Sequence, residues 1–201
     1  MSTSQRGYHH GDLRAALLAA AGEGLESGEP FSMRAVARRA GVSPAAPYRH
    51  FADRDALEAA LAVEAFDDLR GDLERAAADA SGPLVDTVAA LGVAYVDFAL
   101  RRPAVFRLMF GNACDPADAQ RVRAAGALHE VLHDVLSRLL PGKGEGLSMA
   151  LWAMAHGLAF LHLDGKLRPE PRVDVERRVR ASVAAIFALD PPTPTADRSE
   201  R

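Results

Sequence analysis

Apolar residues recur every three or four positions along most of this chain, and strand-like alternation is nearly absent. This spacing gathers leucines on one helix face, as Leu13, Leu17 and Leu25 illustrate near the start. The chain is also rich in alanine, leucine, arginine and glutamate, which favour helix over sheet. Because 49% of the 201 residues are hydrophobic, the helices can bury a substantial core. We therefore predict an all-α fold.

Glycines, prolines and capping residues divide the chain into about nine predicted helices. The first half should contain helices at 12–25, ended by Gly28, at 33–40, capped by Ser32, at 43–50, capped by Ser43, and from an Asp53 cap through Leu73. Longer helices should follow at 84–100, 104–110, 118–140, 147–163 and 173–189. We expect a small domain at 1–55, a larger helical domain at 56–189 and a disordered, proline-rich tail at 190–201.

Residues 31–51 have the layout of a helix-turn-helix. Val36, Ala37 and Ala40 supply a small inner face for the first helix, and Gly41 permits a sharp turn. Val42 should fill the gap between the two helices. In such a motif the second helix lies in the DNA major groove, while the first crosses the backbone.

The same block is a positive island on an acidic protein. The net charge of the chain is −3, yet residues 30–51 contain four arginines, Arg34, Arg38, Arg39 and Arg49, and no acidic residue. A local excess of this kind suits selective contact with phosphate. The alternative is that these arginines form only a solvated face.

The order Gly41-Val42-Ser43, then Tyr48, His50 and Phe51, then Arg54 and Leu57, resembles the DNA-binding motif of the tetracycline-repressor (TetR) family. The resemblance implies a homodimer that binds a palindromic operator in double-stranded DNA, with a helical C-terminal domain that senses an unidentified small molecule. Repression is the commoner behaviour of this family. Phe51 would belong to the core.

The resemblance also assigns contacts to individual residues. Phosphates would be contacted by Ser32, Ser43, Tyr48, His50 and Arg54, and the residues nearest the bases would be Pro44, Ala45, Ala46 and Arg49. Hydroxyl, imidazolium and guanidinium groups are common donors to phosphate, and alanine methyls can meet thymine. Arg49 is the best candidate for a bidentate guanine contact, with a phosphate contact as the alternative.

Two residues depart from the common pattern of the family. Arg54 stands where lysine is frequent, and Pro47 where a larger aliphatic residue is frequent. With Ser43 as cap, Pro47 would remove one early backbone hydrogen bond within the first turn. We therefore expect the second helix to form with a slightly bent start.

A second resemblance lies at 150–161, where Trp152, His156 and Gly157 match the Trp-x-x-x-His-Gly (WHG) pattern of one TetR-family C-terminal domain. Candidates for lining a ligand cavity are mostly aromatic: Tyr95, Phe98, Phe106, Met109, Phe110, Trp152, His156 and Phe160. The alternative is that these residues only fill a core.

The last two predicted helices, 147–163 and 173–189, would pair with their copies in the dimer that this resemblance implies. The second of them carries an apolar stripe, formed by Val175, Val179, Val183, Ile186 and Phe187. Such a stripe fits a dimer interface or an intrachain core equally well. The sequence leaves both possibilities open.

His129, Glu130 and His133 spell H-E-x-x-H, the arrangement in which zinc proteases hold a metal and a general base. Taken alone, the motif suggests a helical zinc-dependent hydrolase as the alternative function. A catalytic zinc site needs a third protein ligand, and no suitably spaced one follows. The sequence contains no Gly-rich phosphate loop, nucleophile elbow or CxxC pair. We therefore expect no enzymatic activity, no cofactor and no metal.

The cysteine content and the hydropathy of the chain predict where in the cell the protein is located. Cys114 is the only cysteine, and the start of the chain lacks the apolar stretch of a secretory signal. The most apolar run, 147–163, is interrupted by Ser148, His156 and His162 and is short for a membrane span. These features predict a cytoplasmic protein that does not cross a membrane.

Overall fold

The computed structural model describes residues 10–111, 118–139 and 144–188, and within these ranges the chain forms helices and no strand. The helices are α1 (His10–Glu26), α2 (Met33–Arg39), a short 3₁₀ helix η1 (Pro47–Arg49), α3 (Arg54–Asp79), α4 (Leu84–Arg101), α5 (Pro103–Gly111), α6 (Ala119–Leu139), α7 (Gly144–Leu163) and α8 (Arg172–Phe187). The predicted all-α fold is confirmed. The predicted tail and Cys114 lie outside the described residues.

Local capping signals set several of these helix ends. The Ser32 hydroxyl oxygen accepts a hydrogen bond from the Ala35 N–H at 3.2 Å, and Asp53 Oδ1 accepts one from the Ala56 N–H at 2.8 Å. Gly28, with a φ of 73°, follows the end of α1 in a left-handed conformation. These three predicted helix boundaries are confirmed.

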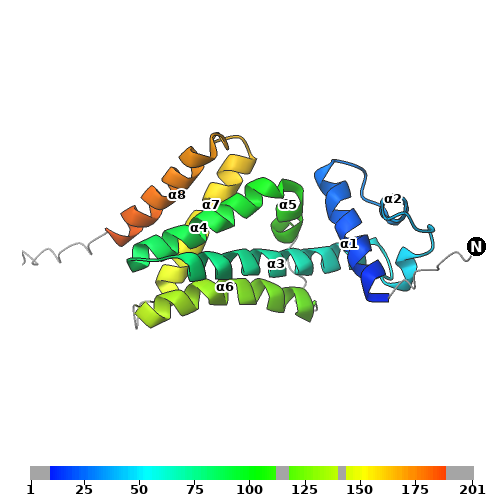
Figure 1. Ribbon diagram of the computed structural model, residues 1–201, viewed down its shortest axis with the longest axis horizontal. Helices are drawn as coiled ribbons and strands as arrows, with labels where there is room; N and C mark the ends of the chain where they lie inside the picture. Colours follow the sequence, from blue (N-terminus) through cyan, green and yellow to red (C-terminus); the bar gives the residue numbers. More distant parts are fainter. Residues whose placement is uncertain (1–9, 112–117, 140–143, 189–201) are drawn as a thin grey trace, which may run out of the picture.

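The long helix α3 runs through the middle of the molecule (Figure 1). α1 and α2 lie at its amino-terminal end, α4 and α6 pack along its length, and α7 and α8 pack on α4. α3 contributes Leu57 and Leu61 to the core beneath α1 and α2, and Leu69 and Leu73 to the larger core. One continuous helix therefore connects both cores.

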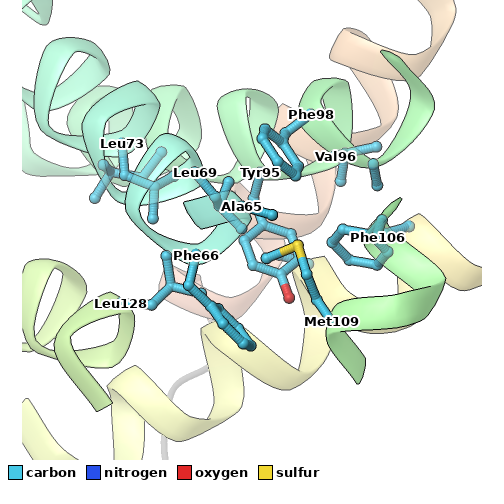
Figure 2. Packing of buried hydrophobic residues seen from close by; sticks show 14 of the residues in the cluster. Ala65, Phe66, Leu69, Leu73, Tyr95, Val96, Phe98, Phe106, Met109 and Leu128 are labelled. Atoms are coloured by element: carbon cyan, nitrogen blue, oxygen red, sulfur yellow. The ribbon is translucent and has the colours of Figure 1, made fainter. Parts of the chain in front are cut away.

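The larger core joins residues of six helices, α3 to α8, around two aromatic side chains (Figure 2). Phe66 comes from α3 and Tyr95 from α4, and both are almost completely buried. Phe106 and Met109 of α5 and Leu128 of α6 close around them. The pocket described below lies between this core, which supplies Leu73, Leu91 and Tyr95 to its walls, and a smaller cluster that supplies Val88, Leu151 and Val183.

The valine stripe of α8 faces the chain's own core. Val175, Val179 and Val183 are buried, and Val179 packs so closely on α4 that a Cβ placed on Gly92 would lie 2.9 Å from its Cγ1 atom. Ile186 and Phe187 are partly buried against a smaller cluster. Of the two possibilities left open by the sequence, the intrachain core holds for the three valines.

Helix α7 is the one described helix that is long and apolar enough to cross a membrane by length and composition. It packs against α4, α6 and α8, and 33% of the stretch 145–163 is buried within the chain. Its outward face keeps Met149 51% exposed and Leu161 43% exposed. α7 is thus a packed helix with an apolar face left uncovered in the single chain.

Candidate nucleic-acid interface and ligand pocket

The first half of the predicted helix-turn-helix forms as expected. Val36 and Ala37 of α2 are buried, and Val36 packs in one cluster with residues of α1 and α3. Gly41 has a φ of 70°, a left-handed conformation that favours glycine, and the chain reverses there so that the Val42 N–H reaches the Ala37 carbonyl at 3.0 Å. α2 and the turn therefore hold the following segment at the surface.

The predicted α-helix at 43–50 is wrong, because this segment is a turn followed by the 3₁₀ helix η1. In an α-helix capped by Ser43, the Ser43 carbonyl would accept the N–H of residue 47, and proline has none. The Ala46 N–H donates to the Ser43 carbonyl instead, at 2.9 Å. The His50 N–H donates to the Pro47 carbonyl, again across three residues, which is the 3₁₀ pattern. Within the described chain, no hydrogen bond to the Ser43 hydroxyl forms the predicted cap.

Most of the predicted DNA-contacting residues reach solvent. Tyr48 is 56% exposed, Arg49 is exposed, and His50 is partly buried. The other exposed members are Ser32, Ser43, Pro44, Ala45 and Arg54. Ala46 is the exception, because it is only 8% exposed and offers little surface to a base.

The arginines of the positive island differ in their partners. Arg39 is bound by Glu29 at 2.6 Å and by the Ser27 hydroxyl at 3.1 Å, so it fastens α2 to the end of α1. Arg38 lies 3.7 Å from Glu29, and just beyond the island Arg54 donates to Glu58 at 2.7 Å. Arg34 and Arg49 form no ion pair with any residue that the structure describes. Their charges are the ones most available for phosphate.

Arg14 of α1 joins this surface, although the sequence analysis did not select it. Its guanidinium lies 5.5 Å from the centre of the Phe51 ring, in a cation–π contact beside His50. Phe51 itself is buried, as predicted. Only the fold brings Arg14 to the segment 48–51, since it lies far from the motif in sequence.

Five of the other seven predicted cavity residues surround the His156 ring. The ring centres of Phe106, Phe110, Trp152 and Phe160 lie 4.7 to 5.9 Å from that of His156, and the Tyr95 hydroxyl lies 2.8 Å from its Nδ1. Burial lowers the pKa of His156 and raises the pKa of Tyr95. Both groups are therefore neutral at pH 7.

An apolar pocket with a free volume of about 40 Å³ opens beside this cluster. Five helices line it: Leu73 of α3; Val88, Leu91, Gly92 and Tyr95 of α4; Leu128, His129 and Leu132 of α6; Leu151, Trp152, Met154 and Ala155 of α7; and Val183 of α8. Only Tyr95 and Trp152 of the predicted set belong to its walls. The other six, Phe98, Phe106, Met109, Phe110, His156 and Phe160, lie outside the walls in the surrounding packing.

The two histidines of the H-E-x-x-H motif have different surroundings. His129 lines the pocket, with its Nε2 3.5 Å from the Ser148 hydroxyl and its ring 5.7 Å from that of Trp152. His133 Nε2 lies 3.2 Å from the hydroxyl of Ser137. Among the described residues no group of three His, Cys, Asp or Glu side chains could hold a metal ion. In the sequence, His129 stood out only as part of the alternative zinc motif, and no local pattern predicted its place in the pocket.

Comparison with known protein families gives a match for the helix-turn-helix region and another for the helical region that holds the pocket. Residues 13–61 match the model of bacterial regulatory proteins of the tetR family, and residues 88–186 match that of the tetracyclin repressor-like C-terminal domain. The chain belongs to the TetR family. The second match contains the Trp152, His156 and Gly157 pattern.

Individual relatives agree with this membership. The HTH-type transcriptional regulator Rv1816 of Mycobacterium tuberculosis is 31% identical over 116 residues, which are 57% of this TetR-family chain and 50% of the relative. The chain thus spans about half the length of the curated relatives it matches.

Solved structures share the fold. A protein of unknown function from Rhodococcus sp. RHA1 is 36% identical, with a TM-score of 0.77 over 89% of this chain and 97% of that one. The TetR-like transcriptional regulator LfrR from Mycobacterium smegmatis, solved in complex with proflavine, is 22% identical, with a TM-score of 0.65 over 89% and 99% of the two chains. The second likeness concerns the fold alone.

Proposed function

We propose that this TetR-family protein is a cytoplasmic transcriptional regulator that binds a palindromic operator as a homodimer and releases or tightens it when a small molecule binds. The observation that carries the proposal is the exposed pair Tyr48 and Arg49 at the tip of a helix-turn-helix whose island of positive charge adjoins Arg14. Guanidinium and phenol groups in this position can donate to phosphate oxygens.

The proposed DNA contacts follow from exposure and chemistry. Phosphates are contacted by Ser32, Ser43, Tyr48, His50 and Arg54, with Arg14 added, and the bases by Pro44, Ala45 and Arg49. Arg49 has the reach and the two parallel donors that guanine recognition needs. Because η1 is a 3₁₀ helix, few side chains can enter the groove together, so Arg49 carries most of the base readout.

The proposed dimer uses α7 and α8. The apolar face of α7 with Met149 and Leu161 is uncovered in the single chain, and Val173 at the start of α8 is 62% exposed. A patch of this kind marks a site of association. A two-fold axis through these helices presents two helix-turn-helix units, which a palindromic operator accepts about one DNA turn, ~34 to 36 Å, apart.

Glu26 offers a route between the ligand domain and the DNA-binding domain. It is the last residue of α1, and its carboxylate accepts the N–H groups of Ala104 at 3.1 Å and Val105 at 2.9 Å at the start of α5. Such N–H groups lack partners within a helix, and negative charge is favourable there. Further along α5, Phe106 packs on the ring of Tyr95 in the pocket wall. A ligand that shifts α5 would thereby move α1.

A mobility-shift assay with the DNA that flanks the gene, repeated across a metabolite panel, tests the proposal. We expect binding of one dimer to a palindromic fragment, and a change of affinity by one compound that corresponds to about 1 to 3 kcal/mol of coupling. Sedimentation of the free protein should give twice the mass of 21.4 kDa. A monomer, or binding without sequence preference, would contradict the proposal.

A further inference from the structure

The walls of the pocket contain no lysine, arginine, aspartate or glutamate among the residues that the structure describes. Most of the lining consists of leucine, valine, methionine and alanine, and the polar atoms come from Tyr95, His129 and Trp152. A carboxylate or ammonium group inside such walls would lose its hydration without gaining a counter-charge. The composition of the walls therefore selects against charged molecules.

The hydrogen-bonding capacity of the walls is concentrated on one residue. The Tyr95 hydroxyl is already engaged with His156 Nδ1 at 2.8 Å and with the Trp152 side chain, so these two polar groups of the walls are occupied by each other and by His156. Ser148 donates its only hydroxyl hydrogen to the Glu145 carbonyl at 2.9 Å, so towards His129 it can act only as an acceptor. That contact is 3.5 Å long, which makes it a weak hydrogen bond. The imidazole of His129 keeps most of its hydrogen-bonding capacity for another molecule.

We propose that the pocket takes a small, uncharged, mainly apolar molecule with one hydrogen-bonding group, and that His129 binds that group. This inference rests on the proposed ligand-responsive function and specifies its effector. The free volume of about 40 Å³ holds only a few non-hydrogen atoms, so a longer molecule must push the walls apart. His129 thus serves ligand selection.

Trp152 supplies a direct readout, because it is the one tryptophan of the chain and lines the pocket. The full-length protein is titrated at pH 7.5 with straight-chain alcohols of increasing length and with carboxylates of matched length, while Trp152 emission and binding heat are followed. Each alcohol should shift the emission with saturation. Its Kd should be at least about tenfold lower than that of the matched carboxylate, a difference of about 1.4 kcal/mol.

Two variants test the role of His129. His129→Phe keeps an aromatic ring beside Trp152 and removes the ring nitrogens, so alcohol binding should weaken about threefold to tenfold, as expected for one lost hydrogen bond. His133→Phe changes the other histidine of the motif, one turn along α6 and outside the pocket walls, and should leave alcohol binding unchanged.

Three results would overturn the inference: carboxylates that bind as tightly as alcohols, no alcohol that perturbs Trp152, or equal weakening by both variants. A parallel mobility-shift assay without any ligand separates this inference from the proposed function. Operator binding by a protein that prefers carboxylates would refute the uncharged effector and leave the regulator intact. Absence of DNA binding would refute the regulator itself.

Discussion

Replacing Gly92 with alanine adds one methyl group at the tightest contact between α4 and α8. Its Cβ would lie 2.9 Å from Val179 Cγ1 and 3.9 Å from Val183 Cγ2, and both valines are fully buried. Overpacking of this kind costs about 1 to 3 kcal/mol, because β-branched side chains have few alternative rotamers. Alanine also favours the helix by about 1 kcal/mol relative to glycine. The two effects oppose each other, so the sign requires a matched control.

Gly126→Ala provides that control. Gly126 lies within α6, and a Cβ there meets no atom within 4 Å, so only the gain in helix propensity remains. Gly126→Ala should raise stability by about 0.5 to 1 kcal/mol, while Gly92→Ala should be neutral or destabilising. The difference between the variants, about 1 to 3 kcal/mol, isolates the clash with Val179 because the propensity gain is common to both.

Thermal unfolding at one fixed protein concentration measures this difference. For a chain of this size, 1 kcal/mol corresponds to roughly 2 to 4 °C in Tm, and a fixed concentration is needed because association raises the apparent Tm. The Gly92→Ala midpoint should fall below that of Gly126→Ala by several degrees. Equal stabilisation by both substitutions would refute the close packing of α4 on α8.

Four further predictions concern the DNA-binding surface, its coupling to the pocket and the pH dependence of stability. Pro47→Ala restores an N–H, so the amide of residue 47 should become protected in hydrogen exchange as 43–50 winds into an α-helix, and selection from random DNA should give a changed operator preference. Arg49→Ala should relax specificity at one base pair by about 1 to 3 kcal/mol. Tyr48→Phe should instead lower the affinity for all DNA sequences by the same factor in binding titrations. An unchanged sequence preference would reassign Arg49 to phosphate, where its loss flattens the slope of log K against log salt by about 0.9. Glu26→Gln removes the negative charge from the start of α5 and should reduce the ligand-induced change in operator affinity, measured by fluorescence anisotropy, more than it reduces DNA affinity without ligand. Because burial lowers the pKa of His156, the unfolded chain binds this proton first, so stability should fall as the pH drops below about 6.5. His156→Gln should make denaturant midpoints less dependent on pH in that range, and an unaltered dependence would contradict the lowered pKa.

Several parts of the fold and the site could be predicted because they depend on neighbouring residues. The caps at Ser32 and Asp53 and the left-handed Gly28 each act within a few residues of the helix end that they define. The prediction of an α-helix at 43–50 was wrong for an equally local reason. Pro47 stands at the first position whose N–H an α-helix needs, one residue beyond the turn in which proline is tolerated.

Whether a predicted helix face or side chain is buried depends on which other elements pack against it, and the periodicity of apolar residues does not show this. The stripe of Val175, Val179 and Val183 was visible in the sequence, but its burial against α4 required the packed chain. The burial of Ala46 could not be inferred from a segment in which its neighbours Pro44 and Ala45 are exposed.

The sequence by itself determined that this chain is helical, where most helices begin and end, and that its amino-terminal part has the helix-turn-helix pattern of the TetR family. These properties follow from hydrogen bonds and side-chain spacing within one or two helical turns. Only the tertiary structure decided that His129 faces a pocket, that Glu26 holds the start of α5, and that Arg14 joins the DNA-binding surface. Each of these contacts joins residues that are distant in sequence, and local spacing and short motifs do not show which distant residues meet.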